Sequence, residues 1–198
     1  YVSRLANRYK NRLEVMAIEA IKDAKSTIRG DGVNVVLNYG RDSSLKEIAA
    51  APADKWSSPD FSILDQLKGM KAKIKDKSRY GVIANTVYLN QTTANYLESN
   101  KEIQKLFEIR RGVDIDMKVT PYQNYEDIEY WGRIGSFRFM IHSGTYLDNG
   151  TRKKIFDDGQ VLLTAPNIRG KRHFGRIISK TAKYKPLSLF IRPYYDEK

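Results

Sequence analysis

Residues 142–163 have the sequence HSGTYLDNGTRKKIFDDGQVLL, which holds one of the two histidines and two Asx-Gly pairs. The pairs Asn149-Gly150 and Asp158-Gly159 are typical of tight hairpin turns, because glycine and asparagine tolerate a positive φ. The stretch therefore predicts a type I′ turn at 149–150 and a second turn at 158–159. His142 is then expected at the end of a strand over residues 137–141.

The same stretch is a poor candidate for a metal or acid–base site. A calcium-binding loop needs acids or amides at alternate positions, and the basic run Arg152-Lys153-Lys154 after Gly150 breaks that pattern. A zinc site needs paired ligands, but His142 and His173 are far apart and lack an HExxH arrangement. The adjacent side chains of Asp157 and Asp158 diverge on a turn. No metal, cofactor or catalytic residue is therefore predicted.

Composition indicates a folded protein with a strong positive charge. The 198 residues are 41% hydrophobic and 29% charged, and 35 Lys and Arg against 23 Asp and Glu give a net charge of +12. The chain has no cysteine, which excludes disulfides, thiolate metal ligands and a cysteine nucleophile. No apolar run approaches the roughly 18 residues that a membrane span needs. The charge fits a polyanion partner, or a neighbouring subunit that carries the acidic complement.

The N-terminal residues predict a long amphipathic helix followed by a strand. Apolar residues recur at helical spacing over residues 4–28, which would make a rod about 37 Å long that ends at Gly30. One narrow apolar stripe on such a rod suggests that it lies across another element. Residues 33–39 are rich in β-branched side chains and predict a strand. Residues 41–58 are ambiguous between a short helix and a connector, with Trp56 as the residue that anchors the segment to the core.

Further elements follow from capping and periodicity. Ser58-Pro59 is expected to start a helix whose exposed face carries Lys68, Lys71 and Lys75. Asn90 is expected to cap a helix, and Ser99 with Glu102 resembles the capping box of the next one. Strands are predicted at residues 81–89, 115–119, 137–141, 161–163 and 187–192. Helices and strands therefore mix without regular βαβ alternation, which indicates the α+β class.

One ordered set of residues resembles the phage capsid protein E family of lambda-like tailed phages. The set is Ser143 to Lys154, Phe156, Asp157, Val161-Leu162, Arg169-Gly170 and Phe174-Gly175, preceded by Tyr39-Gly40-Arg41, Trp56 and Arg110-Arg111-Gly112. Each piece alone is only a turn or an arginine pair, but they occur in the family's order over roughly residues 35–180. The resemblance identifies the chain as a capsid fragment, expected to be prophage-encoded, which lacks the family's N-terminal arm and extended loop.

The resemblance implies a Hong Kong 97-like fold, with a peripheral domain that contains a long spine helix and an axial α/β domain. Residues 1–56 would be the peripheral domain with spine helix, strand and connector, and residues 57–165 the axial domain. Residues 166–198 would return to the peripheral domain.

The function implied is structural: a non-enzymatic major head protein that self-assembles into an icosahedral shell around DNA. The partners implied are copies of itself in hexamers and pentamers, scaffold and decoration proteins, and packaged DNA bound non-specifically, with no membrane. The location implied is the virion, and the bacterial host cytoplasm during assembly. The residues expected to contact neighbours or DNA are Arg110, Arg111, Arg169, Lys171, Arg172 and Arg176.

Two other function classes stay open on the sequence alone. A basic nucleic-acid-binding module would use the net charge and the segment RGKRHFGR at 169–176, where cations alternate with aromatic side chains. No helix-turn-helix, zinc finger or RNP motif supports it. An enzyme remains the third alternative, since acids from distant residues can be assembled in space.

Overall fold

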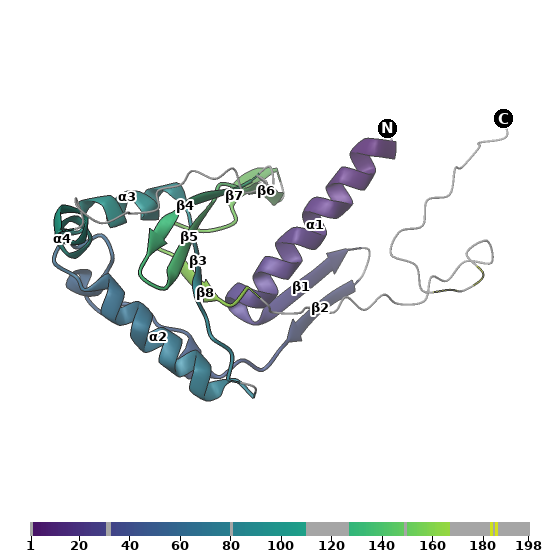
Figure 1. Ribbon diagram of the computed structural model, residues 1–198. Coiled ribbons are helices and arrows are strands. Elements are labelled where there is room, and N and C mark those ends of the chain that lie inside the picture. Colours follow the sequence, from purple (N-terminus) through teal and green to yellow (C-terminus); the bar gives the residue numbers. More distant parts are fainter. Residues whose placement is uncertain are drawn as a thin grey trace. The chain divides into compact units, whose positions relative to one another are not determined.

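Helices and strands follow one another without a repeating order (Figure 1). The computed structural model describes residues 2–30, 33–79, 81–109, 127–148 and 150–166, together with Lys183 and Lys185. The chain divides into two units, Tyr1–Pro166 and Asn167–Lys198. The described residues of the first unit contain four α-helices, two 3₁₀ turns and eight strands, so the α+β class is confirmed. The predicted strands at 115–119 and 187–192 lie outside the described residues.

The first helix, α1 (Val2–Asp23), is shorter at its C-terminus than the predicted helix over 4–28. Ala24 has a φ of 54°, a left-handed conformation that ends a helix, and the carbonyl of Ala24 accepts the N–H of Tyr39 at 2.8 Å. Residues 25–30 are a strand instead. The prediction was wrong because Ile28 continues the helical apolar stripe in sequence, whereas antiparallel pairing with residues 33–38 decides its conformation.

That strand, β1 (Lys25–Gly30), forms an antiparallel hairpin with β2 (Val33–Asn38), where a strand was predicted. Two arginines join the hairpin region to the helix. Nη2 of Arg12 donates to the carbonyl of Thr27 at 2.7 Å, and Nη1 of Arg41 donates to the carbonyls of Ile21 and Lys22 at 3.0 and 2.9 Å. Arg41 thus satisfies carbonyl groups at the end of α1 that have no partner within the helix.

The connector contains two 3₁₀ turns, η1 (Ser43–Leu45) and η2 (Pro52–Asp54). Asp42 caps η1, because its carboxylate accepts the N–H of Ser44 at 2.9 Å. Trp56 is buried in the core, and its Nε1 donates to Oε1 of Gln66 at 2.7 Å. The prediction of Trp56 as an anchor is therefore confirmed.

The second helix, α2 (Ile63–Lys77), begins four residues after the predicted start at Pro59. Residues 58–61 form a turn, in which the N–H of Phe61 donates to the carbonyl of Ser58. The first helical turn is held from another helix: the carboxylate of Glu102 accepts Oγ–H of Ser62 and the N–H of Leu64, both at 3.2 Å. A cap supplied from 38 residues away leaves no local sequence pattern.

Two short helices follow, α3 (Gln91–Ser99) and α4 (Lys101–Ile109). The side chain of Asn90 accepts the N–H of Thr93 at 2.8 Å, so the predicted cap is confirmed. The predicted capping box of Ser99 and Glu102 is wrong. Asn100 is the cap of α4, and its Oδ1 accepts the N–H groups of Glu102 and Ile103.

A four-stranded mixed sheet has the order β4-β5-β3-β8. Its strands are β3 (Thr86–Leu89), β4 (Ile128–Ile134), β5 (Phe137–His142) and β8 (Val161–Thr164). Strands β3 and β5 are parallel and the other neighbours are antiparallel. The predictions for β5 and β8 are confirmed, and β3 is shorter than the predicted strand at 81–89. Strand β4 was not predicted, and among the described strands only β5 pairs with it.

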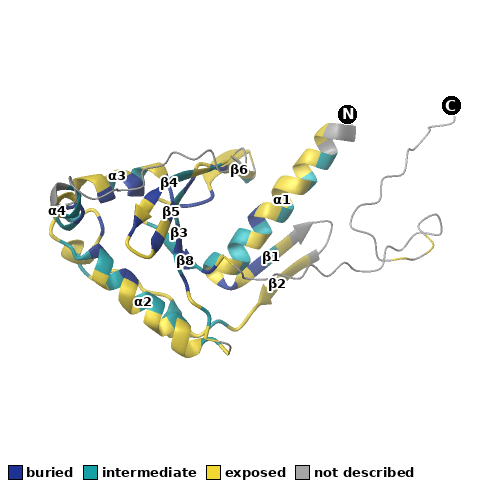
Figure 2. Ribbon diagram, in the orientation of Figure 1, coloured by how far each residue is buried: buried dark blue, intermediate teal, exposed yellow. Residues whose placement is uncertain are grey.

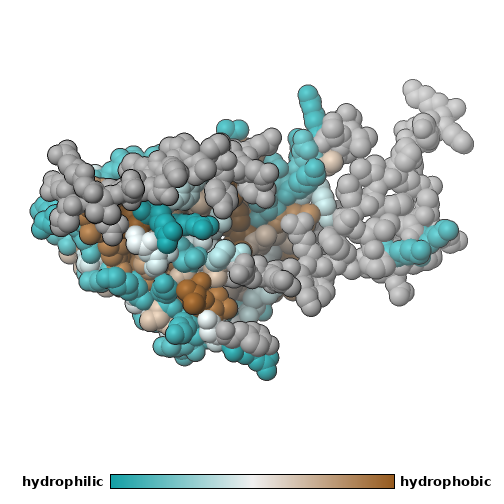
Figure 3. All heavy atoms as spheres, in the orientation of Figure 1, coloured by the Kyte–Doolittle hydropathy of each residue, from teal (hydrophilic) through white to brown (hydrophobic). Residues whose placement is uncertain are grey.

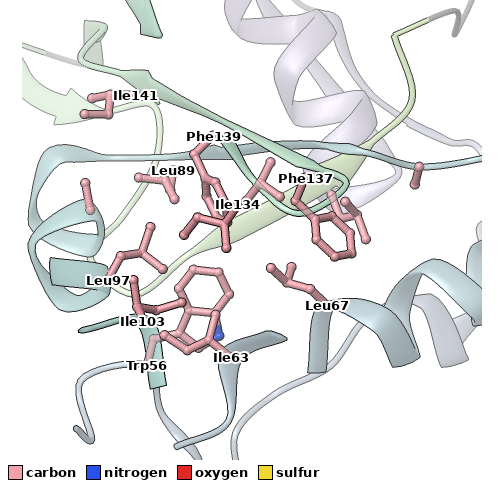
Figure 4. Packing of buried hydrophobic residues seen from close by; sticks show 14 residues of the cluster. Trp56, Ile63, Leu67, Leu89, Leu97, Ile103, Ile134, Phe137, Phe139 and Ile141 are labelled. Carbon is pink, nitrogen blue, oxygen red and sulfur yellow. The ribbon is translucent and has the colours of Figure 1, made fainter. Parts of the chain in front are cut away.

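One face of the sheet forms the core with helices α2, α3 and α4. Alternate residues of the strands point into it, and Figure 4 shows Leu67 of α2 directed toward Phe137, with Trp56 beside Ile63. In Figure 2 the buried residues concentrate on these elements. The buried hydrophobic residues of the cluster are Trp56, Ile63, Leu67, Ala84, Val87, Leu89, Ala94, Leu97, Ile103, Ile134, Phe137, Phe139, Ile141 and Leu163.

Candidate functional site

The residues that the sequence predicts as contacts lie outside the part of the chain that the structure describes. These are Arg110, Arg111, Arg169, Lys171, Arg172 and Arg176. Their role stays a prediction, and the described surface supplies the remaining candidates.

The stretch 142–163 forms a strand end and a hairpin, as predicted. Strands β6 (Thr145–Asp148) and β7 (Thr151–Lys154) pair antiparallel, and Gly150 between them has a φ of 82°. Nζ of Lys153 lies 2.6 Å from Oδ2 of Asp148 across the hairpin. Gly159, with a φ of 80°, turns the chain into β8. The exact turn type depends on Asn149, which is outside the described residues.

His142 is the last residue of β5 and is buried. Its Nδ1 accepts the N–H of Gly144 at 3.1 Å, and its ring lies 5.6 Å from that of Phe156. Oε1 of Glu14 lies 3.8 Å from Nε2, which has no hydrogen-bond partner. Burial lowers the pKa of His142 below its usual 6.5, although Glu14 and Asp127 act in the opposite direction. The side chain is a packed structural group at the point where α1 contacts the sheet.

Asp158 also has a structural role. Its Oδ1 accepts Nζ–H of Lys154 at 2.9 Å and Nδ2–H of Asn90 at 2.5 Å, and these bonds, with Lys154 as the larger cause, lower the pKa of Asp158. The N–H of Gly159 donates to Oγ1 of Thr93 at 2.9 Å. These contacts hold the 156–159 loop against the start of α3.

The described residues contain no group of three or more His, Asp or Glu side chains placed to hold a metal ion. Within the same residues, no helix is both long and apolar enough to cross a membrane.

The β1–β2 hairpin exposes apolar side chains on both of its faces. In β2 and just beyond it, Val35, Val36, Leu37 and Tyr39 are between 42% and 57% exposed, and Figure 2 shows the strand as exposed along its length. Hydrophobic residues also reach the surface among hydrophilic ones on the face seen in Figure 3. Because soluble proteins rarely leave a β-branched strand bare on both faces, this hairpin is a candidate contact surface.

The cations of α2 fall into two groups. Lys68, Lys73 and Lys77 pair with Asp65, Glu47 and Asp42 respectively. Lys71, by contrast, donates to Oγ of Ser136 at 3.2 Å and lies 5.4 Å above the ring of Phe137, without an acid. The predicted lysine row is therefore only partly solvated, because Lys71 contacts the β4–β5 turn.

Two arginines beside that turn were not singled out from the sequence. Arg133 of β4 and Arg138 of β5 are directly opposite each other in the register, and both are exposed. The alternation of Arg138 with buried Phe137 and Phe139 could have placed it on the outer face of a strand. The position of Arg133 depended on β4, which was not predicted.

Comparison with known proteins agrees with this architecture. The family model for phage major capsid protein E matches residues 2–198. The chain is 24% identical over 180 residues to the major capsid protein of Escherichia phage lambda and 25% identical over 180 residues to that of Escherichia phage N15. Each match covers 90% of this chain and 52% of the relative, so the chain spans about half the length of these proteins.

A solved structure has a similar fold. The crystal structure named "putative capsid protein of prophage (E.coli CFT073)" aligns with a TM-score of 0.66 and 22% sequence identity, over 88% of this chain and 50% of that chain. Since the family model covers almost every residue, the chain belongs to the phage major capsid protein E family.

Proposed function

We propose that this chain is part of a structural protein that self-assembles, through repeated contacts between copies, into an icosahedral phage shell enclosing DNA. The match of the family model to residues 2–198 is the observation that carries this proposal. The protein acts by geometry and not by catalysis. Each contact can be weak, because many simultaneous contacts in a closed shell multiply modest affinities.

The proposed architecture is Hong Kong 97-like. In it α1, with 22 residues and a length of about 33 Å, is the spine helix of a peripheral domain over residues 1–56. The core between the mixed sheet and α2 to α4 lies within an axial domain over residues 57–165. Residues 166–198 return to the peripheral domain.

The proposed partners are other copies in hexamers and pentamers, scaffold and decoration proteins, and packaged DNA bound without sequence preference. The protein would reside in the virion after assembly in the host cytoplasm. We place the arginines and lysine of the predicted set, at 110, 111, 169, 171, 172 and 176, among the contacts to neighbours or to DNA. A net charge of +12 supports an anionic surface as one of the partners.

Electron microscopy of the protein, produced at its full natural length and without other phage proteins, tests the proposal. We expect rings, tubes or closed shells that appear above a threshold protein concentration. A protein that stays monomeric at every concentration and binds short duplex DNA with a steep salt dependence would instead be a nucleic-acid-binding module.

A further inference from the structure

Three cations that form no ion pair with a described acid lie beside the β4–β5 turn or contact it. Nζ of Lys71 donates to Ser136 in this turn, and Nε of Arg133 donates to the carbonyl of Gly135 at 2.9 Å. Arg138 lies opposite Arg133 in the register. Lys71, Arg133 and Arg138 are called the basic patch here, and no described acid forms an ion pair with any of them.

The pairing of Arg133 with Arg138 is unfavourable within a single molecule. Like charges directly opposite each other on neighbouring strands destabilise a sheet. The acids that lie near α2 do not relieve this repulsion, since Asp65, Glu47 and Asp42 are engaged by the other lysines of that helix. An anionic partner from outside the molecule would relieve it.

The same strand carries exposed acids at its other end. Glu129 of β4 lies opposite Ile141 in the register and is exposed, and Oε1 of the exposed Glu98 accepts Nε1–H of Trp131 at 3.4 Å. Trp131 is half-buried and contacts Phe139 edge-on, with 5.8 Å between the ring centroids. Glu98 and Glu129, on either side of Trp131, are called the acidic patch. Glu129 forms no ion pair within the described part of the chain.

The two patches cannot neutralise each other within one copy. Arg133 and Glu129 are four residues apart on one strand, which is about 13 Å along it. The β-bulge between Tyr130 and Gly132 also changes the register between them, so that Arg133 lies on the face opposite the core while Glu129 lies on the core side. Ion pairs between these patches are therefore geometrically available only to different copies.

We infer that the basic patch of one copy docks on the acidic patch of a second copy, along β4. This inference rests on the proposed self-assembly and assigns one of its contacts. Two different complementary patches on each molecule produce a head-to-tail contact, which closes into a ring when the rotation between copies permits. Trp131, a half-buried aromatic residue between the two acids, is the apolar anchor of the contact.

DNA is a less suitable partner for the basic patch. A duplex that covered Arg133 and Arg138 would bring its phosphates within about 13 Å of Glu129 on the same strand. That separation is close to the Debye length of about 8–10 Å at physiological ionic strength, so part of the repulsion would remain. Copies in a head-to-tail arrangement satisfy both patches, because one neighbour covers the basic patch and the other neighbour covers the acidic patch.

Charge reversal of each patch in the full-length protein tests the inference. One variant carries Arg133→Glu with Arg138→Glu, a second carries Glu98→Lys with Glu129→Lys, and a third carries all four changes. Lys46→Glu is the matched control, because Lys46 is exposed in the connector and belongs to neither patch. Particle yield is measured by sedimentation and electron microscopy at 0.1 M salt, and the fold of each variant by circular dichroism.

Each single-patch variant is expected to lose particle yield by about tenfold, because every copy then meets its neighbour with like charges. The fourfold variant should regain it, since every head-to-tail contact is again complementary. An equimolar mixture of the two single-patch variants should regain rings with an even number of copies, in which the two variants can alternate. Lys46→Glu should assemble like the wild type.

Three results would overturn the inference. The single-patch variants could assemble normally, or they could fold yet fail to be rescued in both the fourfold variant and the mixture. The arginine variant could also assemble normally and bind short duplex DNA less tightly, which would make DNA the partner of the basic patch. A wild-type protein that never assembles would contradict the proposed function itself. That result differs from failure of this contact alone, in which the wild type assembles.

Discussion

The N–H of Gly144 donates to Nδ1 of His142 at 3.1 Å, at the corner where β5 leaves the sheet and enters the β6–β7 hairpin. An imidazole that accepts at Nδ1 carries its proton on Nε2 when it is neutral. Protonation of His142 would place a second hydrogen at Nδ1 and break this bond. The corner is therefore stable only with a neutral ring.

Stability should consequently fall as the pH is lowered through the titration of His142. Burial lowers the pKa of His142 in the folded state below 6.5, so the unfolded chain binds a proton more readily than the folded chain. The contribution of neutral His142 to the free energy of unfolding is complete above pH 6.5. It is lost progressively as the pH falls below that value. Urea unfolding between pH 7.5 and 5.5 measures this slope, and the non-titrating variant His142→Gln should show a smaller one. If stability depended equally on pH in both proteins, His142 would not be the group responsible for the loss of stability.

Gly144 itself should tolerate no side chain. A Cβ at this position would lie 2.6 Å from Cε1 of His142 and 2.9 Å from Cδ1 of Ile155. Gly144→Ala is expected to cost about 1–3 kcal/mol in the free energy of unfolding, the usual range for overpacking.

Gly69→Ala is the matched control for Gly144→Ala. Gly69 lies inside α2 with open space around its Cβ position, so alanine should stabilise the protein by about 0.5–1 kcal/mol. If both variants changed the free energy of unfolding in the same direction, the space around each glycine would not decide the effect of alanine.

Local patterns predicted the elements whose stabilising contacts are local. The Asn90 cap and the hairpin at 145–154 depend on residues within a few positions of each other, and both are confirmed. The start of α2 depends on a distant group, because Glu102 binds its first turn. The end of α1 was missed because the apolar stripe continues into residues 25–30, which pair with β2 instead. The basic patch was missed because Arg133 and Lys71 come together only through the β4–β5 turn. The predicted contact arginines followed from the family resemblance and lie outside the described residues.

Asn100 should be among the polar residues most costly to remove. It is fully buried, its Nδ2 donates to the carbonyl of Phe61 at 2.8 Å, and its Oδ1 caps α4. Asn100→Ala leaves the Phe61 carbonyl and two helix N–H groups without these partners, and should cost about 2–4 kcal/mol in urea unfolding. Asn95→Ala, at an exposed position of α3, should change stability by about 0.5 kcal/mol or less. If Asn100→Ala and Asn95→Ala lowered the free energy of unfolding by similar amounts, the buried contacts of Asn100 would not explain its cost.

Cysteine pairs can test whether residues 166–198 return to the peripheral domain, which contains β2. The chain contains no natural cysteine, so a disulfide between two introduced residues is unambiguous. Leu37→Cys would be combined in turn with cysteine at each position from 187 to 192. Because successive side chains of a strand point to opposite faces, we expect disulfides with alternate positions only. Ile48→Cys, which replaces an exposed residue of the connector, serves as the control partner and should give no such alternation. Equal disulfide yields at all six positions, or none at any, would contradict the proposed return of residues 166–198 to the peripheral domain.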